Sequence, residues 1–350
     1  MTAVSASARL WKWGIDMTET YITLAHGNGG RYMRELIEEV FARHLGNPLL
    51  DVNADAARLP WDAGELMFTT DGFTVQPLEF PGGDIGSLAV HGTVNDLAVA
   101  GAIPRYLSLN AFIEEGMPLA RLDRIVASLA CAAKAAGVAV AAGDTKVVRR
   151  GEGGGLYLAT AGIGVRVPGI ELGMQTIQPG DAILVSGPVG DHGIAVMLAR
   201  EQFGLKGELA SDSASVLPLT KALLGLPGLR FMRDPTRGGL ATVAHEISRA
   251  TGLQASLQQA DIPVREQVQA VCEILGYDPY YLACEGRVVA IVAAADAALA
   301  LAAWQALPEG QDAALIGHMQ AGRPQVVLHT PLGGTRMLDE LEDDPLPRIC

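Results

Sequence analysis

Residues 119–146 read LARLDRIVASLACAAKAAGVAVAAGDTK, and this stretch decides the fold. Its apolar residues first recur at the three- and four-residue spacing of a helix, which predicts a helix over residues 119–136. Gly137 predicts the end of that helix, because glycine readily adopts the left-handed conformation found there. Residues 138–142 are all apolar and predict a buried strand. A helix that leads into a fully buried strand is typical of α/β proteins.

A polar segment, Gly143-Asp144-Thr145-Lys146, follows the predicted strand directly. Sheets of α/β proteins bind ligands at the carboxyl ends of their strands. Asp144 offers a metal ligand, Thr145 a hydroxyl group and Lys146 a mobile cation. We therefore expect a ligand site at this end of the strand.

A second α/β unit begins after residue 180, where residues 182–186 predict another buried strand. Between the halves, residues 166–180 contain two prolines, three glycines and no strong periodicity, which predicts a domain boundary. A length of 350 residues also fits two domains. We expect an N-terminal domain over residues 21–165 and a C-terminal domain over residues 166–335.

Composition argues against several partners and locations. The net charge of −13 disfavours nucleic acid and anionic membranes as partners. The most apolar run, residues 288–304, is interrupted by Asp296 and predicts a strand and a helix, not a membrane span. The four cysteines lack Cys-x-x-Cys spacing, which fits a reducing cytoplasm. Residues 1–20 do not form a secretory signal; we expect a disordered extension, with translation starting at Met1 or Met17.

The composition of residues 336–350, at the other end of the chain, predicts a mobile tail. It is rich in carboxylates, and Pro345 and Pro347 oppose a helix. Its last residue, Cys350, places a single thiol at the tip of this arm. A frayed terminus that happens to end in cysteine is the alternative interpretation.

Two carboxylates in the first half are further candidates for metal binding. Asp71 follows the β-prone run of residues 66–70, although Asp71-Gly72 is also a common turn. Asp96 lies in a predicted helix of small and apolar residues, with no lysine or arginine four positions away. A buried carboxylate needs a cation or hydrogen bonds. Asp71, Asp96 and Asp144 are therefore candidate metal ligands, and an exposed Asp96 is the alternative.

The second half contains a candidate anion site and a candidate base. Asp234-Pro235-Thr236-Arg237-Gly238-Gly239 precedes a predicted helix, whose free N–H groups and Arg237 suit a phosphate. A capped helix with a surface arginine is the alternative. Glu285 precedes an apolar strand and is either a turn residue or a carboxylate directed into a site. Together, these loops predict a Mg²⁺–nucleotide site without a P-loop, in which Lys146 and Arg237 neutralise phosphoryl charge.

Several of these segments resemble the HypE family of hydrogenase maturation factors. The resemblance extends from about residue 22 to residue 350, and the ending Pro-Arg-Ile-Cys is its most specific part. The Asn-Asp and Gly-Asp-Thr segments are shared with aminoimidazole ribonucleotide synthetase, selenophosphate synthetase and thiamine-phosphate kinase. The matching segments are TDGFTV (70–75), FPGGDIG (80–86), GTVNDLA (92–98), GDTKVV (143–148), DPTRGG (234–239), ACEG (283–286) and PRIC (347–350).

The resemblance implies a two-domain, synthetase-like α/β (α+β) fold with a flexible C-terminal tail and a homodimer formed by the N-terminal sheet domains. It implies that Mg-ATP binds in a cleft. A HypF-like carbamoyltransferase would place a carbamoyl group on Cys350, and this protein would use ATP to dehydrate it to an S-cyanide. The cyanide would pass to iron on a HypC–HypD-like complex and become a ligand of nickel–iron hydrogenase.

The resemblance also implies roles for single residues. Cys350 would carry the carbamoyl group, and Glu285 or Lys146 would be the base near the amide nitrogen. Asp71, Asp96 and Asp144 would hold Mg²⁺ on the polyphosphate. The residues expected to bind ATP and its phosphates are Asn95, Thr145, Asp234, Arg237 and Gly238, and those expected to dock the tail are Pro347, Arg348 and Ile349.

Two alternatives from other functional classes compete with this interpretation. A small-molecule kinase or ligase of the same superfamily would turn over ATP without any need for Cys350. A non-catalytic scaffold would use the tail for docking alone and would show no ATP dependence.

Overall fold

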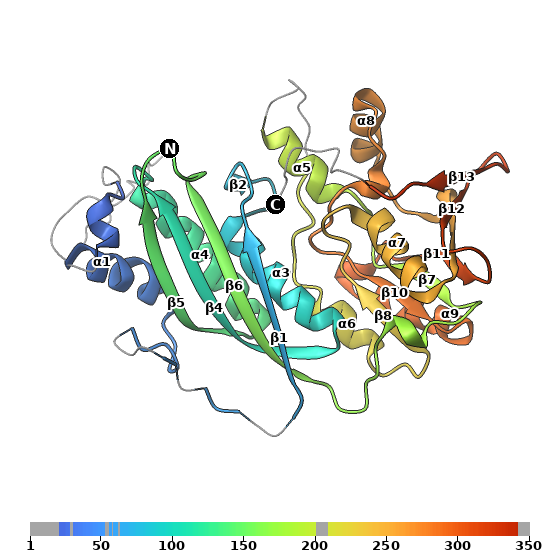
Figure 1. Ribbon diagram of the computed structural model, residues 1–350, viewed down its shortest axis with the longest axis horizontal. Coiled ribbons are helices and arrows are strands. Elements are labelled where there is room, and N and C mark those ends of the chain that lie inside the picture. The colour runs from blue at the N-terminus through green and yellow to red at the C-terminus, as the bar shows by residue number, and fades with distance from the viewer. Residues whose placement is uncertain are drawn as a thin grey trace, which may run out of the picture.

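The computed structural model describes residues 21–28, 31–52, 56–57, 59–61, 64–200 and 209–341. Its architecture is mixed α/β and contains two large sheets (Figure 1). The first has four strands in the order β1-β6-β4-β5, and the second has seven in the order β13-β12-β9-β11-β7-β10-β8. The chain passes from the first sheet to the second between Arg166 and Ala182. Every helix in the described ranges is too short or too polar to cross a membrane.

Among the described residues, helices cover only one face of the four-stranded sheet. Helices α3 (Ile85–Val99) and α4 (Leu119–Ala136) lie behind it in Figure 1. Along β4, alternate side chains point toward these helices and are buried, whereas Asn110 and Phe112 are exposed on the outer face. The strands of this sheet are β1 (Leu66–Phe73), β4 (Ala102–Glu114), β5 (Ala139–Val148) and β6 (Leu156–Arg166).

The helix predicted over residues 119–136 is present as α4, and Gly137 ends it with a φ of 71°.

A short ribbon of two strands precedes α3, and Asp84 caps that helix by accepting hydrogen bonds from Gly86 N and Ser87 N. The remaining N-terminal elements are β2 (Glu79–Phe80), β3 (Gly83–Asp84), α1 (Arg31–Leu36), a π-helical turn (Ile37–Ala42) and α2 (Arg43–Leu45).

The predicted strand end at residue 142 is wrong. Strand β5 continues through the polar segment to Val148, because it pairs in parallel with β4 from Tyr106↔Ala139 to Glu114↔Val148. Asp144 lies opposite Asn110 in this pairing and therefore shares the outer face with it. The polar residues do not interrupt the strand, since that face has no helix over it.

The seven-stranded sheet is buried on both faces. Helix α7 (Gly239–Thr251) covers one face and contacts Ile183 and Val185, whereas Ala182 and Leu184 pack with α6 (Leu217–Leu223) and α9 (Ala297–Gln305) on the other. Its strands are β7 (Ala182–Val185), β8 (Leu229–Arg233), β9 (Gln254–Gln258), β10 (Val289–Val292), β11 (Ala314–Gln320), β12 (Val326–His329) and β13 (Thr335–Leu338).

Three helices connect the two halves. The end of α3 reaches the core of the second half, where Ala98 and Val99 pack with residues of α6 and α9. In the opposite direction, α5 (Asp191–Ala199) and α8 (Glu266–Leu275) contribute to the core around α3 and α4. Residues of each half therefore contribute to apolar clusters of the other half.

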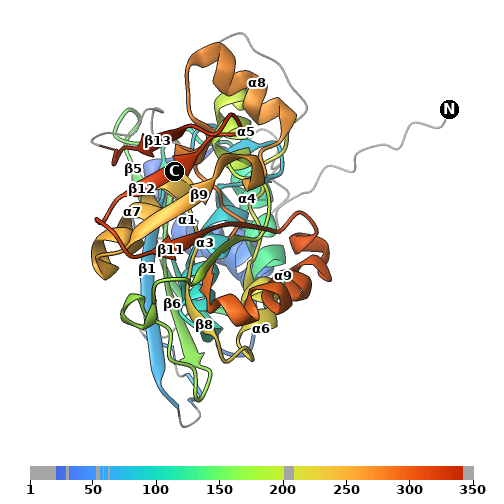
Figure 2. The same cartoon turned by 90° about the vertical axis from the view of Figure 1, so that its right-hand side faces the viewer.

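The predicted tail begins too early. Residues 335–338 form β13, which pairs with β12 at one edge of the large sheet (Figure 2). The Leu338 side chain is 1% exposed, and its carbonyl oxygen lies 2.8 Å from His245 Nε2. The expected extension of residues 1–20 and the tail residues Pro347, Arg348, Ile349 and Cys350 lie outside the described residues.

Replacing Leu338 by alanine tests whether this segment is packed. We expect Leu338→Ala to lower the free energy of unfolding by about 2–3 kcal/mol, because it removes a buried side chain and leaves a cavity. Met337 alternates with it along the strand and is 45% exposed, so Met337→Ala is the matched control and should cost less than about 0.5 kcal/mol. Urea denaturation measures both. Equal small effects would show that the segment is not anchored.

Candidate active site

Three carboxylates lie near one another between the two sheets. Asp71 is on β1, Asp96 is on α3, and Asp234 follows β8 directly. Alternation along β1 places Thr69 on the same face as Asp71, and Thr69 Oγ1 donates a hydrogen bond to Asp96 Oδ2 at 2.8 Å. Residues far apart in the sequence thus form one acidic group.

Burial and mutual repulsion make this group electrostatically unfavourable without a cation. Burial, followed by the charge of Asp96, raises the pKa of Asp234 to about 7. Burial also raises the pKa of Asp71 and of Asp96. Arg237 lowers the pKa of Asp71 and Arg233 lowers that of Asp96, so two arginines offset only part of the negative charge.

The acidic group fits a metal ion that arrives with a phosphate. In the described part of the chain, no three His, Cys, Asp or Glu side chains are close enough to hold a metal ion by themselves. Mg²⁺, however, keeps several waters and is usually bound by one or two carboxylates together with substrate phosphates. The carboxylate donors of Asp71, Asp96 and Asp234 suit that role. From the sequence we predicted that Asp234 helps to bind phosphate, whereas the structure places it beside Asp71 and Asp96.

The loop that carries Glu285 lies beside the loop that carries Asp234. Cys284 N donates to Pro235 O at 3.0 Å, and Glu285 is 5% exposed. Arg237 is exposed next to the start of α7, where Gly238 and Gly239 have φ values of 73° and 60°. A Cβ atom on Gly239 would lie 2.5 Å from Leu282 O, so this close approach requires glycine.

The remaining predicted metal ligand lies elsewhere. Asp144 is on edge strand β5, separated from β1 by β4 and β6, and it faces the outer side of the sheet. Its carboxylate forms an ion pair with Lys146 Nζ at 2.9 Å, and both side chains are more than half exposed. Lys146 lowers the pKa of Asp144. Asp144 therefore does not lie with Asp71 and Asp96 within a single copy of the chain.

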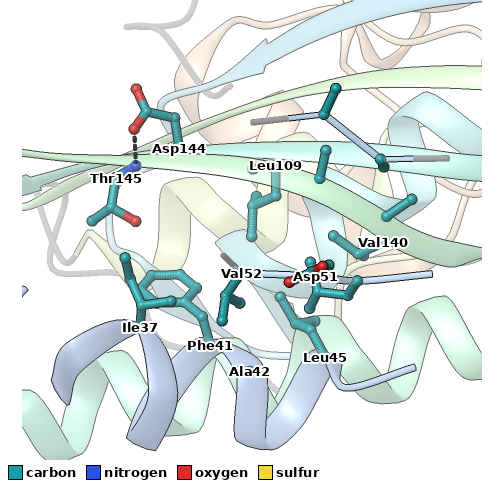
Figure 3. Close-up of a pocket in the computed structure, with 16 residues that line it drawn as sticks. Ile37, Phe41, Ala42, Leu45, Asp51, Val52, Leu109, Val140, Asp144 and Thr145 are labelled. Atoms are coloured by element: carbon teal, nitrogen blue, oxygen red, sulfur yellow. Dashed lines mark hydrogen bonds between the residues drawn. The ribbon is translucent and has the colours of Figure 1, made fainter. Parts of the chain in front are cut away.

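A cavity of about 160 Å³ lies against the inner side of β5 (Figure 3). Phe41 and Leu45 line it from the helical segment, and Val140 and Thr145 line it from the strand. Figure 3 shows the Asp144 carboxylate on the side of the strand away from Phe41. Thr145, which we predicted to bind ATP, borders this cavity.

The structure also corrects the role predicted for Asn95. Its side chain is 1% exposed and makes three hydrogen bonds to backbone groups. Nδ2 donates to Ala214 O at 3.0 Å and to Glu285 O at 3.3 Å, and Oδ1 accepts from Val216 N at 2.8 Å. With both ends of the amide engaged, Asn95 is not placed to bind a phosphate.

Sequence reasoning missed two polar residues of this region. Thr69 could have been found, because a strand alternates and Asp71 is two residues away. Asp212 could not, since it lies in a polar stretch without periodicity and acts only through tertiary contacts. Its carboxylate is buried and accepts hydrogen bonds from Glu285 N and Gly286 N.

Comparison with known proteins first defines the class. Residues 53–166 match the model of the N-terminal domain of AIR synthase related proteins, and residues 178–329 match the C-terminal domain of the same proteins. The two sheets with an acidic group between them are therefore those of an AIR synthase related protein.

Full-length relatives then define the family. The carbamoyl dehydratase HypE of Azotobacter vinelandii is 48% identical over 96% of this chain and 99% of its own length. A crystal structure of hydrogenase maturation protein HypE in complex with ATP has a TM-score of 0.89 at 44% identity and covers 94% of this chain and 99% of that chain. A crystal structure of a HypE–HypF complex has a TM-score of 0.77 at 43% identity, covering 87% and 99%. This chain belongs to the carbamoyl dehydratase HypE family.

The raised pKa of Asp234 predicts how stability depends on pH. Its folded pKa of about 7 lies above the ordinary value, so the folded state holds the proton more tightly and loses stability as the pH rises from about 4 to about 7. Asp234→Asn stays neutral. In metal-free buffer, its free energy of unfolding relative to wild type should increase by about 2 kcal/mol between pH 5 and pH 7.5.

Asp144→Asn is the control for this measurement, because Asp144 is exposed and paired with Lys146. Its difference from wild type should not increase over the same pH range. A difference for Asp234→Asn that is independent of pH would mean that the carboxylate is ionised throughout.

Proposed function

We propose that this chain uses ATP to dehydrate an S-carbamoyl group on Cys350 to an S-cyanide, which supplies the cyanide ligand for the iron of nickel–iron hydrogenase. The observation that carries this proposal is its near full-length likeness to carbamoyl dehydratase HypE, including the HypE structure in complex with ATP. A small-molecule kinase or ligase of the same superfamily is not favoured, because such an enzyme would have no use for the terminal cysteine.

The reaction needs ATP because an amide oxygen is a poor leaving group. The carbamoyl oxygen attacks the γ-phosphorus, and ADP leaves with the electron pair of the broken P–O bond. Phosphate then leaves with the electron pair of the C–O bond. The nitrogen loses two protons overall, and the C–N bond becomes the triple bond of the S-cyanide. ATP, in effect, becomes ADP and phosphate while the carbamoyl group loses the elements of water.

The residues between the two sheets suit this chemistry. Glu285 is the better candidate for the base that takes a proton from nitrogen, since its loop lies beside Asp234. Arg237, which is exposed beside the N-terminal end of α7, suits a phosphate. Mg²⁺, when bound, would neutralise charge on the polyphosphate, and Asp71, Asp96 and Asp234 are the residues that would hold it.

The opposite edge of the sheet suits the other end of the nucleotide. The cavity beside Phe41, Leu45 and Val140 is lined mainly by apolar residues, with Asp51 and Thr145 among its polar ones, so it fits a purine ring better than a triphosphate. Lys146 is exposed and offers a mobile cation. We infer that Lys146 neutralises phosphate charge and that the base for nitrogen is Glu285.

A homodimer formed through the outer face of the four-stranded sheet completes this proposal. Leu66, Phe68 and Phe112 are 51%, 63% and 40% exposed and lie on that face, where no helix of the described part of the chain covers them. Such apolar surface is typical of an interface. Asp144 and Lys146 share the face and would therefore lie at this interface.

Further partners and the location follow from the same reaction. A HypF-like carbamoyltransferase would supply the carbamoyl group, as the HypE–HypF complex supports. A HypC–HypD-like complex would accept the cyanide on iron. A terminal thiol must stay reduced to carry the group, and we therefore propose a cytoplasmic location.

Intact mass spectrometry of the C-terminal peptide tests the reaction. The protein is incubated with HypF, carbamoyl phosphate and Mg-ATP, and we expect a carbamoyl adduct on Cys350 that loses one water only when ATP is supplied. Cys350→Ala should form no adduct while still binding ATP. An unmodified Cys350, with HypF active on a control protein, would overturn the proposed function.

Phe68→Glu tests the homodimer. A charged side chain in an apolar interface should convert the dimer to a monomer in light scattering after size-exclusion chromatography. S-cyanide formation should fall with it. Leu299→Glu, at a similarly exposed position on α9 (59%), is the matched control and should stay dimeric and active. If both variants remain dimeric, the interface lies elsewhere.

A further inference from the structure

We propose that Asn95 and Asp212 are positioning residues for Glu285, which they hold through its main chain from two sides. This inference rests on the proposed function, in which Glu285 is the base. Asn95 comes from helix α3 in the first half, and Asp212 comes from residues 209–216, which lead into α6 in the second half. Neither side chain needs to touch the substrate to fulfil this role.

Asp212 holds the amide side of the loop. Its Oδ1 atom accepts from Glu285 N at 3.1 Å and its Oδ2 atom accepts from Gly286 N at 3.3 Å. Arg287 Nε lies 3.4 Å from Oδ2 and compensates the buried charge. A Cβ atom on Gly286 would lie 1.9 Å from Asp212 O. The two chain segments are therefore in direct contact, and a side chain at position 286 would separate them.

Asn95 holds the carbonyl side of the same residue. Its Nδ2 atom donates to Glu285 O, which also accepts from Ala214 N at 3.3 Å. Its other contacts, to Ala214 O and Val216 N, fasten residues 209–216 to α3. Both main-chain polar groups of Glu285 are thus bound by this arrangement.

The position of Asn95 in the sequence gives the arrangement its significance. It precedes Asp96 in the same turn of α3. Asn95 therefore holds the main chain of the base, and Asp96 provides an acidic ligand. The distance between Glu285 and the acidic group is therefore set by a single rigid element. A displacement of about 1 Å in a catalytic group is enough to cost about 100-fold in rate.

Two nearly isosteric substitutions reverse the hydrogen-bond polarity at each end of Glu285. Asp212→Asn places an NH₂ group against main-chain donors, and Asn95→Asp places a carboxylate oxygen against main-chain acceptors. We expect each to lower the single-turnover rate from S-carbamoyl to S-cyanide by about 10- to 100-fold with an unchanged KM for ATP. The holoprotein charged by HypF is used throughout.

The matched control is Asp181→Asn. Asp181 is also buried, accepts from Gln178 N at 2.7 Å and lies 3.6 Å from Arg230 Nε. It precedes Ala182, which pairs with Val292 at the end of the β7–β10 ladder away from Glu285. Its rate should equal that of wild type, even if its melting temperature falls as far as that of Asp212→Asn.

A double-mutant cycle separates positioning from a general loss of structure. If Asp212 acts through Glu285, adding Asp212→Asn to Glu285→Gln should cause no further loss of rate. The proposal would be overturned if the losses of rate were additive in the double variant. It would also be overturned by wild-type rates in both positioning variants, or by an equal loss of rate in Asp181→Asn. Since the two variants act on opposite sides of Glu285, either one carries the test if the other fails to fold. A wild-type protein that forms no S-cyanide would instead refute the proposed function itself.

Discussion

The burial of helix α3 on nearly all sides is the constraint on which the rest of the structure depends. The helix packs against the four-stranded sheet and α4, and its end enters the core of the second half. Its small and apolar residues allow this close packing, but every polar group that it carries then needs a partner. Asp84 caps its start, Thr93 bonds with Thr160, Asn95 holds residues 209–216 and Asp96 accepts from Thr69. A helix fixed in this way leaves its functional residues little freedom.

The elements with strong periodicity could be predicted from the sequence. The α4 helix, its glycine terminus and two apolar strands of the second half, β7 and β10, follow from local pattern and composition. The end of β5 could not be predicted, because its continuation depends on pairing with β4, a strand distant in sequence. Likewise, the first residues of the predicted tail belong to β13, because they pair with β12.

The candidate site could be predicted in part, for the same reason. The sequence predicts Asp71 from its place at the end of a strand and Asp96 from its lack of a local cationic partner, and the structure brings the two together. Asp144 resembled them in sequence but lies on the opposite edge and face of the sheet. Asn95 and its neighbour Asp96 were both predicted to lie in the Mg-ATP site, although successive residues of a helix point in directions about 100° apart. Only the tertiary structure distinguishes a residue that faces the acidic group from one that holds the adjacent loop.

The anchoring of β13 has a consequence for how the terminal thiol reaches the site. Leu338 fixes the start of the last segment, and residues 339–350 can extend at most about 40–45 Å from it at about 3.3–3.6 Å per residue. A group attached to Cys350 is therefore confined to a small volume around its own subunit. Short tethers of this kind give effective concentrations on the order of millimolar. In the proposed reaction, the carbamoyl group on Cys350 would therefore be a local supply, and occupancy of the site would not depend on its concentration in the surrounding solution.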